Sequence, residues 1–301
     1  LSIVIKHSAT PSAGLYFLDG VPNRSPLPSV CSYGEGGLHA NWLPFYADPN
    51  DKFSTEMVVT VGKPYTALSN GNLLASRENP DGSRTFHWFQ DRPHSGYLLA
   101  LFVGDYDSVR LDPAFGTIPL TGWVPRGRTE EGRFAFRNTS RMVEFFSERF
   151  GYRYPWEKYD QVAAIDYPIG AMENTSVTGH RDFLLRLSDI PDNDGPQLKT
   201  YTSHWGSDGL IAHELAHHWF GDNLTCRSLA SIWLNESFAT YAEMLWDEKT
   251  GGAEFLQFKA WHARQQYLTY VGKEHIIRPM EYRYYDTRDE MYNEEHTYLK
   301  G

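Results

Sequence analysis

The sequence predicts an α+β protein in which an all-β region precedes a region of mixed strands and helices. From residue 1 to about residue 106, short β-type runs alternate with turn residues. Further along, apolar residues recur at helical spacing between single strands. The 301-residue chain is also roughly twice the common domain size. We therefore expect two domains, residues 1–116 and residues 117–301.

The first region is predicted from its strands and from one turn signal. The turn signal is NPDG at residues 79–82, which favours a tight reversal between two strands. The stretch DSVRLDPAFG at residues 107–116 is rich in turn residues and has no clear period, so the domain boundary is placed near residue 116. The predicted strands have the sequences LSIVI (1–5), EMVVTV (56–61), RTFHWF (84–89) and GYLLALFVG (96–104).

The second region alternates strands with helices. An amphipathic helix is expected over residues 133–151, where large apolar side chains recur near helical spacing and Gly151 closes the pattern. A loop rich in Pro, Asp, Asn and Gly follows at residues 187–208. The remaining predictions are strands at 117–125 and 159–166, a helix from Asp208 to Gly221 and a helix from Ser231 to Gly251.

Composition narrows the classes of function. The content of 41% hydrophobic residues is that of a folded protein, and the net charge of -10 without any Lys/Arg-rich run argues against nucleic acid as a partner. No apolar run approaches the roughly 18 residues that span a bilayer, and the amino end lacks a signal-peptide pattern, so we expect a soluble chain without a membrane segment. Cys31 and Cys226 form neither a disulfide framework nor a CxxC site. Compartment and oligomeric state stay open.

The segment HELAH at residues 213–217 carries the chemistry. His213 and His217 lie one helical turn apart on one face, so that both imidazoles can bind one zinc ion, and Glu214 is suited to take a proton from a water molecule. A solvated helix with this pattern by chance is the alternative interpretation. Glu236 on the next predicted helix counts against that alternative, because a helix pair can bring its carboxylate back to the two histidines as a third ligand.

The chain resembles the M1 family of zinc aminopeptidases. In that family HExxH is followed by eighteen residues and a glutamate, the spacing of His217 and Glu236 here, within HELAHHWFGDNLTC and WLNESFATYAE. The family's GAMEN motif stands complete at residues 170–174. The resemblance is strongest over residues 133–243. It implies a partial N-terminal β-domain, a thermolysin-like α/β zinc peptidase domain, and one zinc ion per chain.

The resemblance also implies how such an enzyme would bind and cut its substrate. Tyr298, in YLKG, matches a tyrosine that assists the transition state, with Glu214 as the base. Glu35, nine residues before Pro44, would join Glu173 in binding the free ammonium group of a peptide. Gly170, Ala171 and Met172 would bind the substrate beside Glu173. The implied activity is hydrolysis of the N-terminal peptide bond, and Glu243 is a candidate acceptor for a histidine N–H group.

Some features depart from the family pattern. The family usually has a helical domain after the catalytic one, whereas this chain ends at Gly301, so a catalytic domain truncated at its C-terminal end is expected. Ser237 stands where the family more often has Gly, and the loop at 187–208 is longer than usual; both bear on substrate preference. Two alternatives stay open. One is a bifunctional hydrolase of the leukotriene A4 hydrolase type. The other is a peptide-binding or zinc-stabilised fragment without turnover, against which an intact Glu214 argues.

Overall fold

The computed structural model describes residues 2–44, 46–185, 207–275, 277–286 and 288–301. Contacts divide the chain into two compact units. Unit 1 comprises Leu1–Arg110, Thr121–Thr129 and Trp156–Asp182, and unit 2 comprises Leu111–Leu120, Glu130–Pro155 and Phe183–Gly301. The domain boundary near residue 116 stays a prediction. The predicted loop at 187–208 falls almost wholly outside the described residues.

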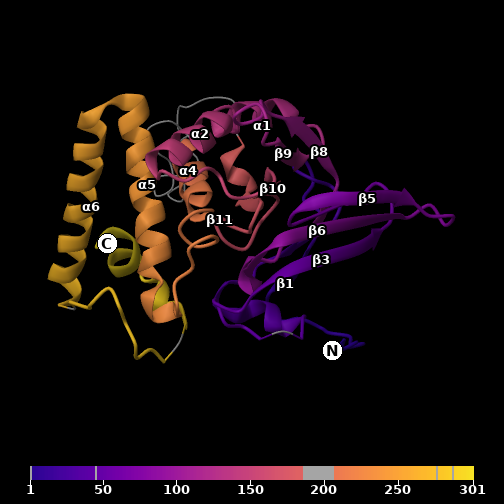
Figure 1. The fold of residues 1–301 in the computed structure, drawn as a ribbon, viewed down its shortest axis with the longest axis horizontal. Helices are drawn as coiled ribbons and strands as arrows, with labels where there is room; N and C mark the ends of the chain where they lie inside the picture. Colours follow the sequence, from indigo (N-terminus) through magenta and orange to yellow (C-terminus); the bar gives the residue numbers. More distant parts are fainter. Residues whose placement is uncertain (1, 45, 186–206, 276, 287) are drawn as a thin grey trace. The chain divides into compact units, whose positions relative to one another are not determined.

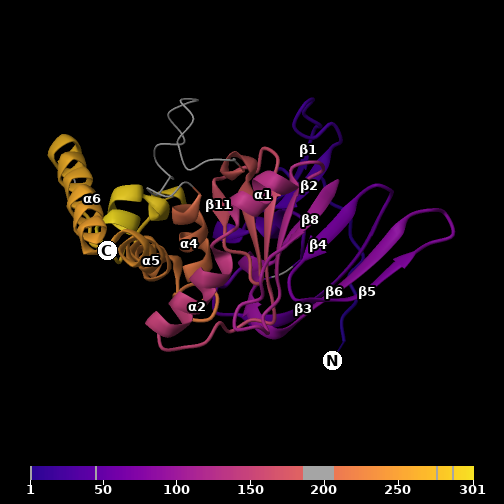
Figure 2. The ribbon, with the colours of Figure 1, turned by 90° about the horizontal axis from the view of Figure 1, so that it is seen from above.

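Unit 1 is built from three sheets (Figures 1 and 2). The first has the order β1-β2-β7-β4, with β1 Leu15–Leu18, β2 Ser29–Ser32, β7 Leu101–Gly104 and β4 Thr66–Ser69. The second has the order β3-β6-β5, with β3 Lys52–Val61, β6 Arg84–Ser95 and β5 Asn72–Glu78. The third has the order β11-β12-β10-β9-β8, with β11 Ala171–Met172, β12 Val177–Arg181, β10 Tyr159–Ala164, β9 Leu120–Pro125 and β8 Tyr106–Arg110. The short 3₁₀-helices are η1 Glu35–Asn41 and η2 Gly96–Leu98.

Strand burial in unit 1 follows the sequence pattern. In β3 partly buried and exposed residues alternate, as in a strand with one face packed, whereas β10 is buried along its whole length. The NPDG turn joins β5 to β6, with Gly82 at a φ of 83°. One core joins residues from several of these strands, including Leu68, Phe102 and Val162. The predicted strands at 56–61 and 84–89 are therefore confirmed, and the predictions at 117–125 and 159–166 are confirmed for residues 120–125 and 159–164. The strand predicted at 96–104 is confirmed only at Leu101–Gly104, because Gly96–Leu98 form η2.

The predicted strand at the amino end is wrong. Residues 2–10 have no regular secondary structure, and Ile3 and Val4 are 75% and 82% exposed. A β-branched run forms a stable strand only when a neighbouring strand satisfies its backbone groups and its side chains pack. The described residues provide no such partner strand for this run.

Helices dominate unit 2. They are α1 Thr129–Ala135, α2 Thr139–Arg149, α4 Asp208–His217, α5 Trp233–Gly251 and α6 Ala253–Glu274. The 3₁₀-helices of this part of the chain are η3 Asp182–Leu184, η4 Leu229–Ser231 and η5 Arg288–Tyr292, and η6 Glu294–Leu299 is a short π-helix. Helices α5 and α6 lie side by side, with η6 against both (Figures 1 and 2). No pattern had predicted α6, of whose residues only Ala263 is buried. None of the helices in the described ranges combines the length and apolar character needed to cross a bilayer.

The helix predicted over residues 133–151 is in fact two helices. The α-helical hydrogen-bond pattern is interrupted between α1 and α2, where Arg137 N–H and Thr139 N–H bond to carbonyls three residues before them instead of four. Asn138 also sends its side-chain Nδ2 to the Asp208 carboxylate at 2.8 Å instead of facing solvent. This bond ties the residue that precedes α2 to the start of α4. The apolar stripe still packs as predicted, since Met142 and Phe146 are fully buried.

A close approach in the unit 1 core yields the first prediction. A Cβ on Gly179 would lie 2.6 Å from the Phe102 ring, and Phe102 is fully buried. Gly179→Ala should therefore lower the free energy of unfolding by about 1 to 3 kcal/mol, because the buried ring must shift. Urea denaturation measures this difference. Gly62→Ala is the control, since no atom lies within 4 Å of its added Cβ. Equal stability of the two variants would contradict the packing described.

Candidate functional site

Helix α4 carries His213, Glu214 and His217, and its first turn is fastened by Asp208. The Asp208 carboxylate accepts hydrogen bonds from Asn138 Nδ2 at 2.8 Å and from Trp246 Nε1 at 3.2 Å. Asp208 thus connects the start of α4 to the residue preceding α2 and to α5. A negative side chain also suits the positive end of the helix dipole. The orientation of α4 against α5 is fixed by buried contacts.

The helix ends earlier than predicted. It stops at His217 rather than at Gly221, and Asp222 N–H bonds back to the His217 carbonyl at 2.9 Å. Gly221 has a φ of 140°, outside the helical region, and its N–H bonds to the Leu224 carbonyl. The chain therefore turns immediately after the second histidine.

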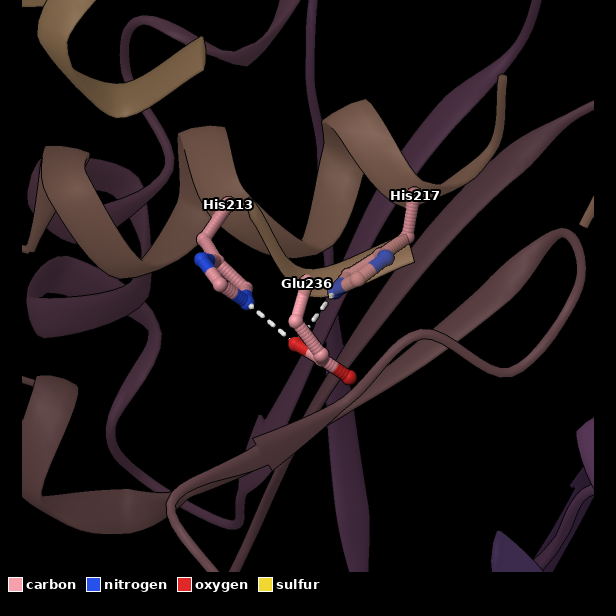
Figure 3. Close-up of side chains that lie close together, drawn as sticks. All are labelled: His213, His217 and Glu236. Carbon is pink, nitrogen blue, oxygen red and sulfur yellow. Dashed lines mark ion pairs between the residues drawn. The ribbon is translucent and has the colours of Figure 1, made fainter. Parts of the chain in front are cut away.

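Helix α5 brings Glu236 to the two histidines. Its Oε2 lies 3.3 Å from His213 Nε2 and 3.4 Å from His217 Nε2. Figure 3 shows both imidazole rings pointing from α4 toward this one carboxylate oxygen. One ligand atom from each of the three residues falls within 4.8 Å of the others, and the side chains of His217 and Glu236 are almost wholly buried. Two imidazole nitrogens and a carboxylate oxygen are a donor set that zinc accepts.

The opposite nitrogen of each imidazole ring has its own acceptor. His213 Nδ1 lies 2.8 Å from Glu243 Oε1, and His217 Nδ1 lies 3.0 Å from the Phe220 carbonyl. Because a carbonyl only accepts, His217 Nδ1 carries a proton, and in a neutral ring Nε2 then presents a lone pair to Glu236. A lone pair facing a carboxylate is stable only with a proton or a cation between them. The arrangement therefore fits a bound metal ion.

The pKa shifts of His213 and Glu236 also favour a positive charge between the imidazoles and the carboxylate. Burial alone would lower the pKa of His213, but its hydrogen bonds to Glu236 and Glu243 raise that pKa to about 10. Burial alone would raise the pKa of Glu236, but His217 and His213 lower it to about 2. The two opposite directions mean that the charged forms of His213 and Glu236 stabilise each other. A divalent cation would replace the proton at this point.

Tyr298 lies on η6, a π-helical segment, beside the first histidine. Its ring stacks on the His213 ring with the centroids 6.2 Å apart and the planes inclined by 23°. Short π-helical segments occur often at functional sites. Glu214, between the two histidines in sequence, is buried.

The two predicted ammonium-binding carboxylates lie together in unit 1. Carboxylate oxygens of Glu35 and Glu173 come within 4.8 Å of one another, although the residues are far apart in sequence. At an effective dielectric of about 20, two such charges repel by on the order of 3 kcal/mol. A cation between them would relieve this repulsion. The boundary predicted near residue 116 separates the two glutamates, yet both belong to one compact unit.

Each carboxylate of this pair is held by a tyrosine that the sequence did not single out. Tyr33 Oη donates to Glu35 Oε2 at 2.9 Å, and Tyr97 Oη donates to Glu173 Oε1 at 3.5 Å. Burial, together with the carboxylates of Glu35 and Glu173, raises the pKa of Tyr33, so that its hydroxyl stays a donor. Tyr33 could have been suspected from its place two residues before Glu35. Nothing in the sequence indicated Tyr97.

His39 fixes the backbone of the segments that carry Glu35 and Glu173. Trp42 Nε1, which only donates, bonds to His39 Nδ1 at 2.9 Å, so Nε2 carries the proton and donates to the Leu99 carbonyl at 2.8 Å. Burial lowers the pKa of His39 to about 4, which keeps the ring neutral. The same Leu99 carbonyl accepts from Asn174 Nδ2 at 3.2 Å. The segments bearing the two glutamates therefore meet at the turn that bears Tyr97.

The GAMEN segment forms the end of a sheet. Ala171 and Met172 make β11, which pairs antiparallel with β12 and is the last strand in the order of the five-stranded sheet. Met172 is fully buried in the core, whereas Gly170 and Ala171 are partly buried. The Gly170 carbonyl accepts from Arg181 N–H at 2.9 Å. An edge strand is a usual place for a peptide to add by backbone pairing.

Two helices that bring His213, His217 and Glu236 together, and an edge strand followed by a glutamate, define a protein of the HExxH peptidase class. The Peptidase family M1 domain matches residues 134–301, more than half of the chain. The chain belongs to peptidase family M1.

Several proteins similar to this chain are named aminopeptidases. The puromycin-sensitive aminopeptidase of Caenorhabditis elegans is 30% identical over 220 residues, which cover 73% of this chain and 22% of that protein. Aminopeptidase N of Acetobacter pasteurianus is 34% identical over 202 residues, covering 66% of this chain and 54% of that protein. Human glutamyl aminopeptidase is 32% identical over 204 residues, covering 67% and 20%. The chain thus spans between a fifth and about half of the length of these relatives.

Proposed function

We propose that this chain carries the catalytic residues of a zinc-dependent aminopeptidase, which removes the N-terminal residue from peptides. The observation that carries the proposal is the convergence of His213, His217 and Glu236 on one buried point. Membership of peptidase family M1 and the names of the relatives support the reaction class. One zinc ion per chain would be held by these three residues, with Glu243 orienting His213.

Glu214 and Tyr298 would have different roles in the hydrolysis. When bound, zinc would polarise the scissile carbonyl and lower the pKa of a water molecule at its open position. Glu214 would take a proton from the attacking water as the oxygen–carbon bond forms, and would pass that proton to the leaving amine as the carbon–nitrogen bond breaks. The Tyr298 hydroxyl would donate a hydrogen bond to the oxyanion that develops on the carbonyl.

Selection of a free N-terminus would come from the carboxylate pair. Glu35 and Glu173 would bind the α-ammonium group, because two partly desolvated carboxylates make strong charge-assisted hydrogen bonds to a cation. The edge strand formed by Ala171 and Met172, with Gly170 before it, would pair with the substrate backbone. An acetylated N-terminus has no positive charge and leaves the carboxylates to repel each other. The proposed substrates are therefore peptides with a free amino end.

The metal assignment is tested by removing its carboxylate ligand. Glu236→Ala should weaken zinc binding by at least about 100-fold, and Glu243→Ala by about 10-fold, because the second residue only orients a ligand. Competition against a chelating fluorophore measures both affinities. Glu254→Ala, at an exposed position in the first turn of α6, is the control. Unchanged affinity at one zinc per chain in the Glu236 variant would rule out this ligand set.

The role of the base is tested without removing the metal. Glu214→Gln should retain zinc and lower the turnover of leucine p-nitroanilide by roughly 100-fold or more, since an amide cannot accept the proton. Zinc content and turnover are measured on the same preparation, with Glu254→Gln as the control. Turnover within about tenfold of the parent would remove Glu214 from this role. A parent chain that binds zinc but hydrolyses no aminoacyl anilide would instead be a zinc-stabilised binding module.

The ammonium site is tested by the preference for free over N-acetylated substrates. Glu173→Ala should reduce the ratio of kcat/KM for leucine p-nitroanilide to that for its N-acetyl form by about 10-fold or more, because the charge pairing is lost. Glu35→Ala should act in the same direction but less strongly, since one carboxylate is left. Glu78→Ala, at an exposed site in the same unit, is the control. A ratio that stays at the parent value in both variants would contradict the two-carboxylate site.

A further inference from the structure

Ser237 follows Glu236 directly in α5, and its hydroxyl makes a bond outside its own helix. Ser237 Oγ donates to the Thr297 carbonyl at 2.6 Å, and both residues are buried. A serine within a helix more often faces solvent or bonds to the carbonyl four residues before it. In the same helix, Thr250 does the latter, donating to the Trp246 carbonyl at 2.8 Å. The Ser237 bond is therefore a specific tertiary contact.

The accepting carbonyl belongs to the peptide group that joins Thr297 to Tyr298. The Thr297 residue is also held through its N–H, which bonds to the Asn293 carbonyl, and through Oγ1, which bonds to the Met291 carbonyl at 2.7 Å. Among the bonds described for this residue, the one from Ser237 is the bond that reaches α5. It ties the η6 backbone, immediately before Tyr298, to the helix that carries Glu236.

The position of the Tyr298 ring depends on that backbone. The ring lies over His213, with the centroids 6.2 Å apart and the planes inclined by 23°. A hydroxyl that must meet a developing oxyanion tolerates little displacement, because a shift of about 1 Å can cost on the order of 100-fold in rate. A glycine or alanine at position 237 has no group that could hold the Thr297 carbonyl.

We propose that Ser237 is a positioning residue for Tyr298: its bond to the Thr297 carbonyl keeps the phenol over the His213 ring. The inference rests on the proposed function, in which Tyr298 stabilises the oxyanion. Ser237 itself touches neither the substrate nor the reacting atoms in this role.

A double-mutant cycle tests this coupling. Ser237→Ala should lower kcat for leucine p-nitroanilide by roughly 10-fold with KM nearly unchanged, because only the transition-state interaction is displaced. In a Tyr298→Phe background, where no phenol hydroxyl remains, the same substitution should have no further effect. Thr250→Ala, which removes a hydroxyl bonded within its own helix, should leave kcat unchanged in both backgrounds. Zinc content is measured for every variant.

The outcomes separate positioning from a general structural effect. An equal loss of kcat from Ser237→Ala in both backgrounds, or a loss of zinc, would overturn the proposal. Crystal structures of the parent and of Ser237→Ala give a readout that does not depend on turnover. In the variant we expect the Tyr298 ring to move away from its stacked position on the His213 ring. A ring that stays in place overturns the proposal. If the ring moves while the parent shows no turnover, the positioning inference stands and the proposed function fails.

Discussion

The Glu236 carboxylate, which meets two imidazole nitrogens through one oxygen, is the interaction on which the arrangement of unit 2 depends. A buried carboxylate is unfavourable unless opposite charge or hydrogen-bond donors surround it. Both histidines must therefore be held at fixed positions on α4. The carboxylate of Asp208 fixes the start of that helix, and aromatic packing of Phe145 against Trp246 supports α5. The Glu243 carboxylate then fixes the His213 ring from the other side.

Unit 1 also holds buried carboxylates that need hydrogen-bond donors. Glu35 and Glu173 are brought together against their mutual repulsion, and the scaffold supplies the opposing force through two tyrosine hydroxyls and a buried, neutral His39. A cation between the two carboxylates would relieve this repulsion.

Sequence reasoning was successful where a short-range pattern determines the outcome. The spacing of His213 and His217 requires them to share a helix face, and the NPDG turn and the β3 alternation are equally local. It failed where distant contacts decide. Among the described residues, no strand pairs with residues 2–5. The helix predicted over residues 133–151 is interrupted near Asn138, and α4 ends at His217, where Asp222 N–H bonds back to the His217 carbonyl. Tyr97 and the task of Ser237 could not be predicted, since each acts through a residue at least sixty positions away. Glu243 was only a candidate until its distance to His213 was known.

We propose that His213, His217 and Glu236 together bind one zinc ion. Anomalous X-ray diffraction at the zinc absorption edge, on crystals of the chain grown with zinc, would locate that ion. We expect one strong peak per chain, within about 2.0 to 2.2 Å of His213 Nε2, His217 Nε2 and a Glu236 carboxylate oxygen. A zinc peak bound to other residues, or a fully zinc-saturated crystal without a peak among these three, would contradict it.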